Sequence, residues 1–242
     1  MNNCKSCTAE LTGNYCINCG QPAKLKRIDR HYIIHEIEHV LHFDKGILFT
    51  TKELLIRPGE SVREYLSENR SRLVKPIIFV ILTSLIYSLV NHFFHIEQGY
   101  VSYQQEALKD SAIFKMLDWI QSHYGYANIL MGVFIAGWIK LFFRKYQYNF
   151  FEILILLCFA MGISMLICAI AAIFEGLLQV HLMQYAGMLM VVYSAWAIGQ
   201  FFDKTKAINY FKAVMAYLIG ILSFYILLSI LGIVIDLALK KI

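Results

Sequence analysis

Residues 150–174, FFEILILLCFAMGISMLICAIAAIF, decide the fold of this chain. A helix needs about 20 apolar residues to cross the hydrocarbon core of a bilayer, and here the single charge, Glu152, lies near the start. Of all 242 residues, 58% are hydrophobic and 16% are charged, whereas soluble domains average about 45–50% and about 25%. The sequence therefore predicts an all-α polytopic membrane protein.

Four other apolar stretches predict further spans. Together with the first stretch they give about five transmembrane helices, over residues 76–94, 127–143, 150–174, 186–202 and 211–235. Pro76 suits the first turn of a helix, where its missing N–H costs nothing. The predicted domains are a zinc ribbon or knuckle (1–24), amphipathic juxtamembrane helices (25–75) and a transmembrane domain (76–242). Within the last, the outer segment 96–126 is expected to form a short surface helix.

The distribution of lysine and arginine predicts the orientation. Residues 1–75 hold twelve of the 22 basic residues, and the second and fourth connections are also basic, whereas the third connection has none. Because basic loops stay in the cytoplasm, we expect a multi-pass protein of a bacterial cytoplasmic (inner) membrane with a cytoplasmic N-terminus. The basic residues alternate with acidic ones, so nucleic-acid binding is not expected.

The N-terminal head carries the strongest chemical signal. Cys4-x-x-Cys7 is followed after eight residues by Cys16-x-x-Cys19, and two such turns supply the four thiolates of a tetrahedral zinc site. A pair of disulfides is the alternative, which a cytoplasmic location disfavours; iron in a rubredoxin-like site is another. Four protein ligands leave no open position on the ion, so we expect a structural Zn²⁺.

A histidine-rich helix is predicted between the head and the membrane, over residues 31–43. His31, His35, His39 and His42 share one arc, and isoleucine, valine and leucine occupy the other. Within it, His35-Glu36-x-x-His39 matches a zinc metalloprotease motif, in which the histidines bind zinc and the glutamate activates water. A polar helix face, a second metal site and a pH-sensing surface are the alternatives.

A juxtamembrane elbow is predicted between this helix and the first span. Thr50-x-x-Glu53 matches a helix cap, and Arg57-Pro58-Gly59 is expected to break the helix. Arg63, Arg70 and Arg72 are expected to attract anionic lipid headgroups, although a protein-binding surface is the alternative.

A stripe of small residues marks the third span. Its members recur at every fourth position and are Ala160, Ser164, Cys168, Ala172 and Gly176. Small residues at this spacing let helices approach closely, so the stripe predicts a packing seam, either inside the chain or between copies in a homo-oligomer. Lys140 and Glu152 are expected to pair near the inner interface, and Glu175 and Asp236 belong to a polar group that is expected to line an outer vestibule or be solvated.

Several motifs occur together along the chain. They are Tyr15-Cys16-x-x-Cys19-Gly20-Gln21, His39-x-x-His42-x-Asp44-Lys45-Gly46, Leu54-x-x-Arg57-Pro58-Gly59, Arg63-Glu64-Tyr65, Arg70, Pro76 and Asn149-Phe150-x-Glu152. In this combination the chain resembles a bacterial zinc-ribbon membrane protein family of unknown function (domain-of-unknown-function family 3667). The resemblance implies a cytoplasmic-membrane location and a zinc-binding head, and it brings no known activity or substrate.

Three functions follow from these observations. The first is a non-enzymatic adaptor or regulatory membrane protein, whose zinc head and elbow dock a cytoplasmic partner. The second is a membrane transporter or pore, and the third is a membrane-bound zinc metalloprotease that uses His35, Glu36 and His39.

Overall fold

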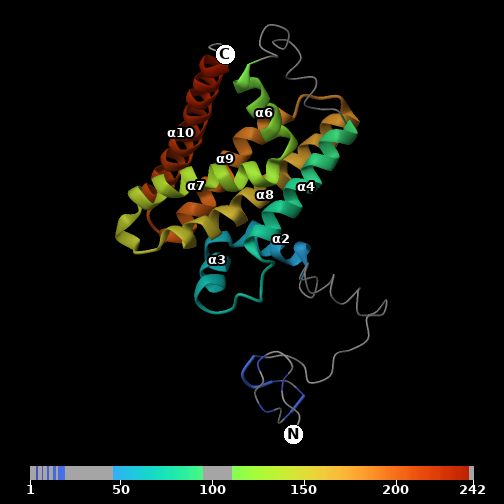
Figure 1. Ribbon diagram of the computed structural model, residues 1–242. Helices are drawn as coiled ribbons and strands as arrows, with labels where there is room; N and C mark the ends of the chain where they lie inside the picture. The colour runs from blue at the N-terminus through green and yellow to red at the C-terminus, as the bar shows by residue number, and fades with distance from the viewer. Residues whose placement is uncertain are drawn as a thin grey trace. The chain divides into compact units, whose positions relative to one another are not determined.

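The computed structural model describes residues 46–94 and 111–239 and, near the N-terminus, residues 4, 7, 10, 13, 14 and 16–19. The chain divides into two compact units, Met1–Asp44 and Lys45–Ile242. The described elements of the second unit are α2 (Ile47–Ile56), α3 (Pro58–Ser67), α4 (Pro76–Phe94), α6 (Ala112–Ser122), α7 (Tyr124–Phe142), η1 (Arg144–Tyr146), α8 (Phe150–Leu178), α9 (Met183–Asp203) and α10 (Ala207–Leu239) (Figure 1).

Five of these helices, α4, α7, α8, α9 and α10, are long and apolar enough to cross a membrane. The predicted all-α polytopic fold is therefore confirmed. Several helices run past the spans predicted from apolar residues alone: α8 continues to Leu178, and α10 starts at Ala207. The reason is that a helix ends where its last backbone groups find capping partners, and the apolar stretch can end earlier.

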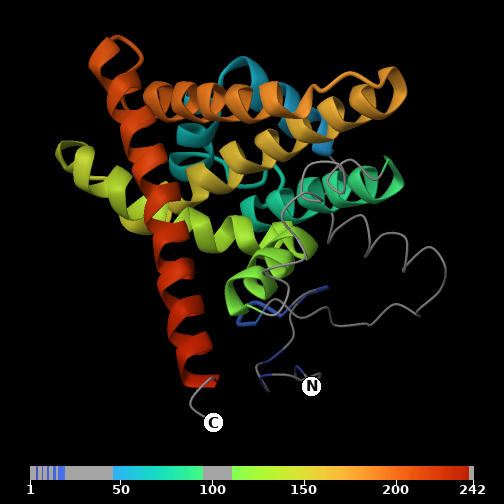
Figure 2. The same cartoon turned by 90° about the horizontal axis from the view of Figure 1, so that it is seen from above.

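Helix α8 is the centre of the membrane unit. Of the most apolar 18-residue stretch of α8, 72% is buried inside the protein, whereas the corresponding value for α10 is 17%. It packs against α4, α7 and α9, and Figure 2 shows α4, α8 and α9 running side by side. The long apolar stretch that opened the sequence analysis is thus surrounded mainly by protein, and α10 carries much of the lipid-facing surface.

The small-residue stripe of α8 packs against other helices of the chain, and four of its five members are buried. Ser164 Oγ lies 3.3 Å from Ser194 Oγ of α9, and Cys168 Sγ lies 2.9 Å from the Met190 sulfur of the same helix. At Gly176 an added Cβ would come within 2.1 Å of the Phe94 ring of α4. Of the two interpretations of the stripe, the packing supports a seam inside one chain.

At one end of the bundle, two acidic side chains form hydrogen bonds that cap the first turns of helices. The Glu175 carboxylate is buried and accepts hydrogen bonds from the N–H groups of Leu182 and Met183 at the start of α9, both at 2.8 Å. Asp236 accepts from the N–H of Ala112, the first residue of α6, at 2.8 Å. Because both carboxylates stabilise helix N-termini, the predicted polar vestibule is not supported by these two residues.

The expected pair between Lys140 and Glu152 is wrong. Lys140 Nζ donates to the carbonyl of Tyr148. Glu152 instead accepts from the N–H of Asn149 at 2.7 Å, and the Asn149 side chain accepts from the N–H of Glu152 at 2.9 Å. This reciprocal capping box starts α8 and satisfies two backbone donors locally.

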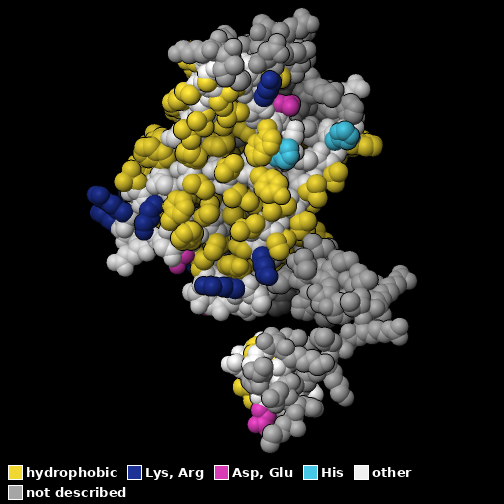
Figure 3. Space-filling view, viewed as in Figure 1, with side chains coloured by type: hydrophobic (Ala, Val, Ile, Leu, Met, Phe, Trp, Pro, Cys, Tyr) yellow, Lys and Arg dark blue, Asp and Glu magenta, His cyan; other side chains and the backbone are white. Residues whose placement is uncertain are grey.

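The short helix expected within the segment 96–126 is α6, and it packs against α10. At Gly232 of α10 an added Cβ would come within 2.3 Å of the Ile113 side chain, so the two helices need the glycine for their close approach. Residues 96–110 of the predicted outer segment lie outside the described residues. Figure 3 shows broad apolar surface on the membrane unit, with most of the lysine and arginine side chains in view at its left and lower edges.

Candidate metal centre and juxtamembrane elbow

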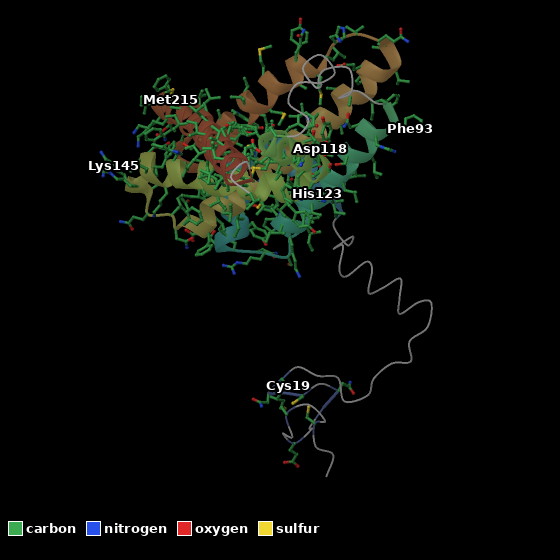
Figure 4. All side chains as sticks on the ribbon, turned by 45° about the horizontal axis from the view of Figure 1, so that its top comes forward. Cys19, Phe93, Asp118, His123, Lys145 and Met215 are labelled. Atoms are coloured by element: carbon green, nitrogen blue, oxygen red, sulfur yellow. The ribbon has the colours of Figure 1, made fainter. Side chains whose placement is uncertain are left out.

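The four cysteines of the N-terminal unit form a candidate metal centre. Cys4 Sγ lies 3.5 Å from Cys19 Sγ, and Cys7 Sγ lies 3.4 Å from Cys16 Sγ. All four sulfur atoms lie within 4.8 Å of one another, and the labelled Cys19 marks their place in Figure 4. These residues could bind one metal ion.

The donor set fits a tetrahedral ion. Metal–thiolate bonds of about 2.3 Å place the sulfur atoms of a tetrahedron about 3.8 Å apart, which falls inside the observed range. The sulfur atoms are too far apart for disulfides, whose S–S bonds are about 2.05 Å. Cys4 and Cys16 are each 3% exposed, so half of the ligand set is shielded from solvent even though this unit is small.

The predicted histidine helix lies outside the described residues. This applies to residues 31–43, and hence to His35, Glu36 and His39 of the metalloprotease hypothesis. Among the described residues, the Cys4–Cys7–Cys16–Cys19 group is the only cluster of histidine, cysteine and acidic side chains with metal-binding geometry.

The second candidate site is the elbow, which consists of α2, α3 and the turn 68–75 before α4. The helix break predicted at Arg57-Pro58-Gly59 is confirmed, because α2 ends at Ile56 and α3 begins at Pro58. The predicted cap at Thr50 is wrong, because α2 begins three residues earlier, at Ile47. Thr50 is fully buried, and its hydroxyl accepts a hydrogen bond from the N–H of Val74 at 3.1 Å. This contact closes the turn onto α2.

An ion-pair network joins the three parts of the elbow. The Glu53 carboxylate lies 2.7 Å from both Arg57 and Arg72. Arg72 also pairs with Glu64 of α3, and Arg57 lies 3.6 Å from the same carboxylate. Because the Glu53 side chain is only 14% exposed, the loss of a partner would leave a largely buried charge. The network therefore ties α2, α3 and the turn into one body.

We expect the Glu53–Arg72 pair to show a measurable coupling energy. A double-mutant cycle with Glu53→Gln and Arg72→Met should give about 1 kcal/mol, since the pair is partly shielded and belongs to a network. Thermal unfolding of the four variants in detergent measures this quantity. Stability losses that simply add would contradict the network.

The elbow is fixed to the end of α9 by an arginine. Arg63 Nη1 donates to the carbonyl of Gln200 at 2.6 Å and to the carbonyl of Phe201 at 2.7 Å. These carbonyls belong to the last turn of α9, where intrahelical partners are missing and the helix dipole favours a cation. Arg63 and Arg72 thus bind protein groups, and the expectation that they face lipid headgroups is wrong. Arg70 is exposed.

Replacing Arg63 by methionine is expected to destabilise the membrane unit by about 1.5 kcal/mol, because hydrogen bonds from a charged donor are lost. Arg70→Met is the matched control, since Arg70 lies on the same elbow and is exposed. The measurement is the apparent Tm in detergent. Equal shifts for the two variants would refute the role of Arg63 as a helix cap.

Two further contacts seat the elbow on the bundle. The Tyr193 hydroxyl of α9 donates to the carbonyl of Leu54 at 3.1 Å, and the Tyr65 ring packs edge-on against Phe159 of α8 at 5.4 Å between centroids. Burial raises the pKa of Tyr65 above its ordinary value, so this side chain stays neutral in its packing role. Neither partner was identified from the sequence, because a contact between residues so far apart in the chain leaves no local pattern.

Comparison with known proteins identifies the same part of the chain. A family model described as a protein of unknown function (DUF3667) matches residues 44–88, which include the elbow and most of α4. No curated protein and no solved structure matches the chain.

Proposed function

We propose that this chain, whose residues 44–88 match the model of a family of unknown function (DUF3667), is a non-enzymatic adaptor or regulatory protein of a bacterial cytoplasmic membrane. Its N-terminal unit holds a structural Zn²⁺ and docks a cytoplasmic partner. The observation that carries this proposal is the combination of a closed four-cysteine cluster with an elbow fixed to the membrane bundle.

Zinc is the ion that we propose for the cysteine cluster. A tetrahedral set of four thiolates is typical of zinc or of iron–sulfur centres, and zinc is the usual ion when all four positions are occupied by cysteine in a small structural module. Binding would supply folding energy to a unit too small for a substantial core. The ion would have no open position, so the cluster supports a structural role.

The cytoplasmic placement of the elbow side rests on the positive-inside rule. The connections on that side carry Arg144, Lys145, Lys204 and Lys206. In the described part of the opposite side, 111–123 and 179–182, the basic residue is Lys115. Figure 4 labels Lys145 and Phe93 at opposite ends of the membrane unit, and Phe93 lies at the end of α4 that would face outwards.

The interior of the bundle, as far as the structure describes it, supports a pore less well than it supports an adaptor. Its buried hydroxyls bond to neighbouring helix groups: Thr83 donates to Phe79 O at 2.8 Å, and Ser164 donates to Ala160 O at 3.0 Å. The buried Asn128 side chain donates to Ser84 at 3.3 Å. These groups are already satisfied by the protein, as expected for helix packing in a membrane.

The adaptor proposal is tested by quantitative co-purification from solubilised membranes. The intact protein is compared with the double variant Cys4→Ser, Cys16→Ser and with Cys158→Ser, a control that removes a buried cysteine of α8. We expect a stoichiometric cytoplasmic partner with the intact protein and with the control, and its loss with the double variant. The same set of bound proteins in all three preparations would refute the proposal.

A further inference from the structure

Helix α2 is apolar on two sides. One side is buried against the bundle and includes Leu54, which is 1% exposed. The other side is exposed: Leu48 is 85% exposed, Ile56 62% and Leu55 49%. At 100° per residue these three side chains fall within one arc of about 100°, and Lys52 falls within the same arc. A free face of this composition on a water-exposed helix would be unfavourable.

The position of α2 relative to the spans indicates what covers this face. Thr50 bonds to the N–H of Val74, and Val74 comes two residues before Pro76, which opens the first candidate span. Four residues further along α2, the carbonyl of Leu54 meets the Tyr193 hydroxyl of α9. Tyr193 is the middle residue of a second span, which runs from Met183 to Asp203. Helix α2 therefore lies beside two spans, with Thr50 next to the start of the first span and Leu54 next to the second.

The charges beside the exposed face are basic. Lys52 lies within the face, and the exposed Lys75 immediately precedes Pro76. The acidic residue of α2, Glu53, is directed to Arg57 and Arg72. Lysine side chains at the ends of spans place their stems along apolar surface and their ammonium groups among lipid phosphates.

We propose that the exposed face of α2, formed by Leu48, Lys52, Leu55 and Ile56, is a lipid-binding surface that lies in the membrane interface and recruits anionic phospholipids. The apolar side chains enter the acyl region, and Lys52 and Lys75 bind the phosphodiester headgroups. This interaction is that of an amphipathic interfacial helix, here held at a fixed depth by its contacts with the turn and with α9. It does not depend on the metal centre or on the adaptor role.

Photocrosslinking of the full chain in nanodiscs tests the proposal. The photoreactive amino acid p-benzoylphenylalanine replaces Leu48, and the nanodiscs contain phosphatidylcholine and phosphatidylglycerol at three to one. A matched positive control carries the same group at Leu222 of α10, a lipid-facing position that is 58% exposed. Mass spectrometry should detect phospholipid adducts at both positions. An adduct at position 48 to another part of the chain, to a second copy or to no molecule at all would overturn the proposal.

Lysine variants test whether the surface prefers anionic headgroups. At position 48 the phosphatidylglycerol share of the lipid adducts should exceed its bulk share, and the ratio of phosphatidylglycerol to phosphatidylcholine adducts should rise above the bulk ratio by about fivefold for each lysine that binds a headgroup. Lys52→Gln with Lys75→Gln should return this share to the bulk value. Lys115→Gln, which removes an exposed lysine from α6, should leave it unchanged. If phosphatidylglycerol forms only its bulk share of the adducts when both lysines are present, the proposed recruitment of anionic lipid is wrong.

Discussion

Replacing Gly59 with alanine is expected to detach the elbow from α9. An added Cβ would lie 2.3 Å from the carbonyl carbon of Gln200 and 2.4 Å from the backbone nitrogen of Phe201. Backbone atoms of a packed helix cannot move aside as a flexible side chain can, so we expect a loss of about 3 kcal/mol in the free energy of unfolding. The apparent Tm in detergent should fall by several degrees. Trypsin should also cut faster at the exposed Arg70 in the adjoining turn.

The control for this prediction is another glycine-to-alanine change. At Gly187, within α9, an added Cβ would meet nothing within 4 Å, and alanine is the better helix residue by about 0.5–1 kcal/mol. Gly187→Ala should therefore leave the Tm unchanged or raise it. If Gly59→Ala behaves like Gly187→Ala in both Tm and proteolysis, the close contact between α3 and α9 is wrong.

Removal of the metal ligands is expected to unfold the N-terminal unit and to leave the membrane unit folded. In the double variant Cys4→Ser, Cys16→Ser two of the four ligands are lost, and structural zinc sites contribute about 10–16 kcal/mol to such small units. The two compact units divide at Asp44 and Lys45, so little of this loss should reach the bundle. Proteolysis should degrade the first residues rapidly, whereas the apparent Tm of the bundle should stay within about 1 °C.

Cys158→Ser separates this effect from the loss of any cysteine. Cys158 is buried in α8, away from the N-terminal unit along the chain, so its replacement should not increase proteolysis of residues 1–44. A bundle Tm that falls in parallel with metal loss would contradict the independence of the two units.

Part of this architecture could be predicted, because it depends on residues that are close together in the sequence. The apolar stretch 150–174 specifies a spanning helix by its length, and Pro58 specifies the break between α2 and α3 by its missing N–H. The spacing of Cys4, Cys7, Cys16 and Cys19 likewise indicates a metal site, because each C-x-x-C turn brings two sulfur atoms together. In each case the relevant residues are close in sequence, so the pattern can be recognised without a structure.

The contacts that hold the elbow could not be predicted in this way. Arg63 bonds to carbonyls of Gln200 and Phe201, which are more than 130 residues away, and any basic residue near a span equally suggests a lipid headgroup. Thr50 matched the sequence pattern of a helix cap, but the actual N-cap of α2 is Gly46. This residue has a φ of 52°, a conformation that favours glycine, and the helix therefore begins earlier. Tertiary contacts decided the first case, and the backbone conformation of Gly46 decided the second.

The structure also changes how the elbow relates to the membrane. From the sequence, Arg63, Arg70 and Arg72 were the expected lipid contacts. Arg63 binds the end of α9 and Arg72 belongs to the Glu53 network, whereas Arg70 is exposed. The exposed positions beside the apolar face belong instead to Lys52 and Lys75. The same segment therefore has one side fixed to protein and another that is apolar and exposed, and the N-terminal unit provides a separate candidate metal centre.

Metal analysis of the purified full chain tests the central claim most directly. We expect one zinc per chain in the intact protein and in Cys158→Ser, and none in the double variant Cys4→Ser, Cys16→Ser. Two zinc ions per chain, of which one persists in the double variant, would indicate a second site and would favour the metalloprotease hypothesis. An intact chain that contains no zinc would contradict the account of the N-terminal unit as a zinc-stabilised adaptor.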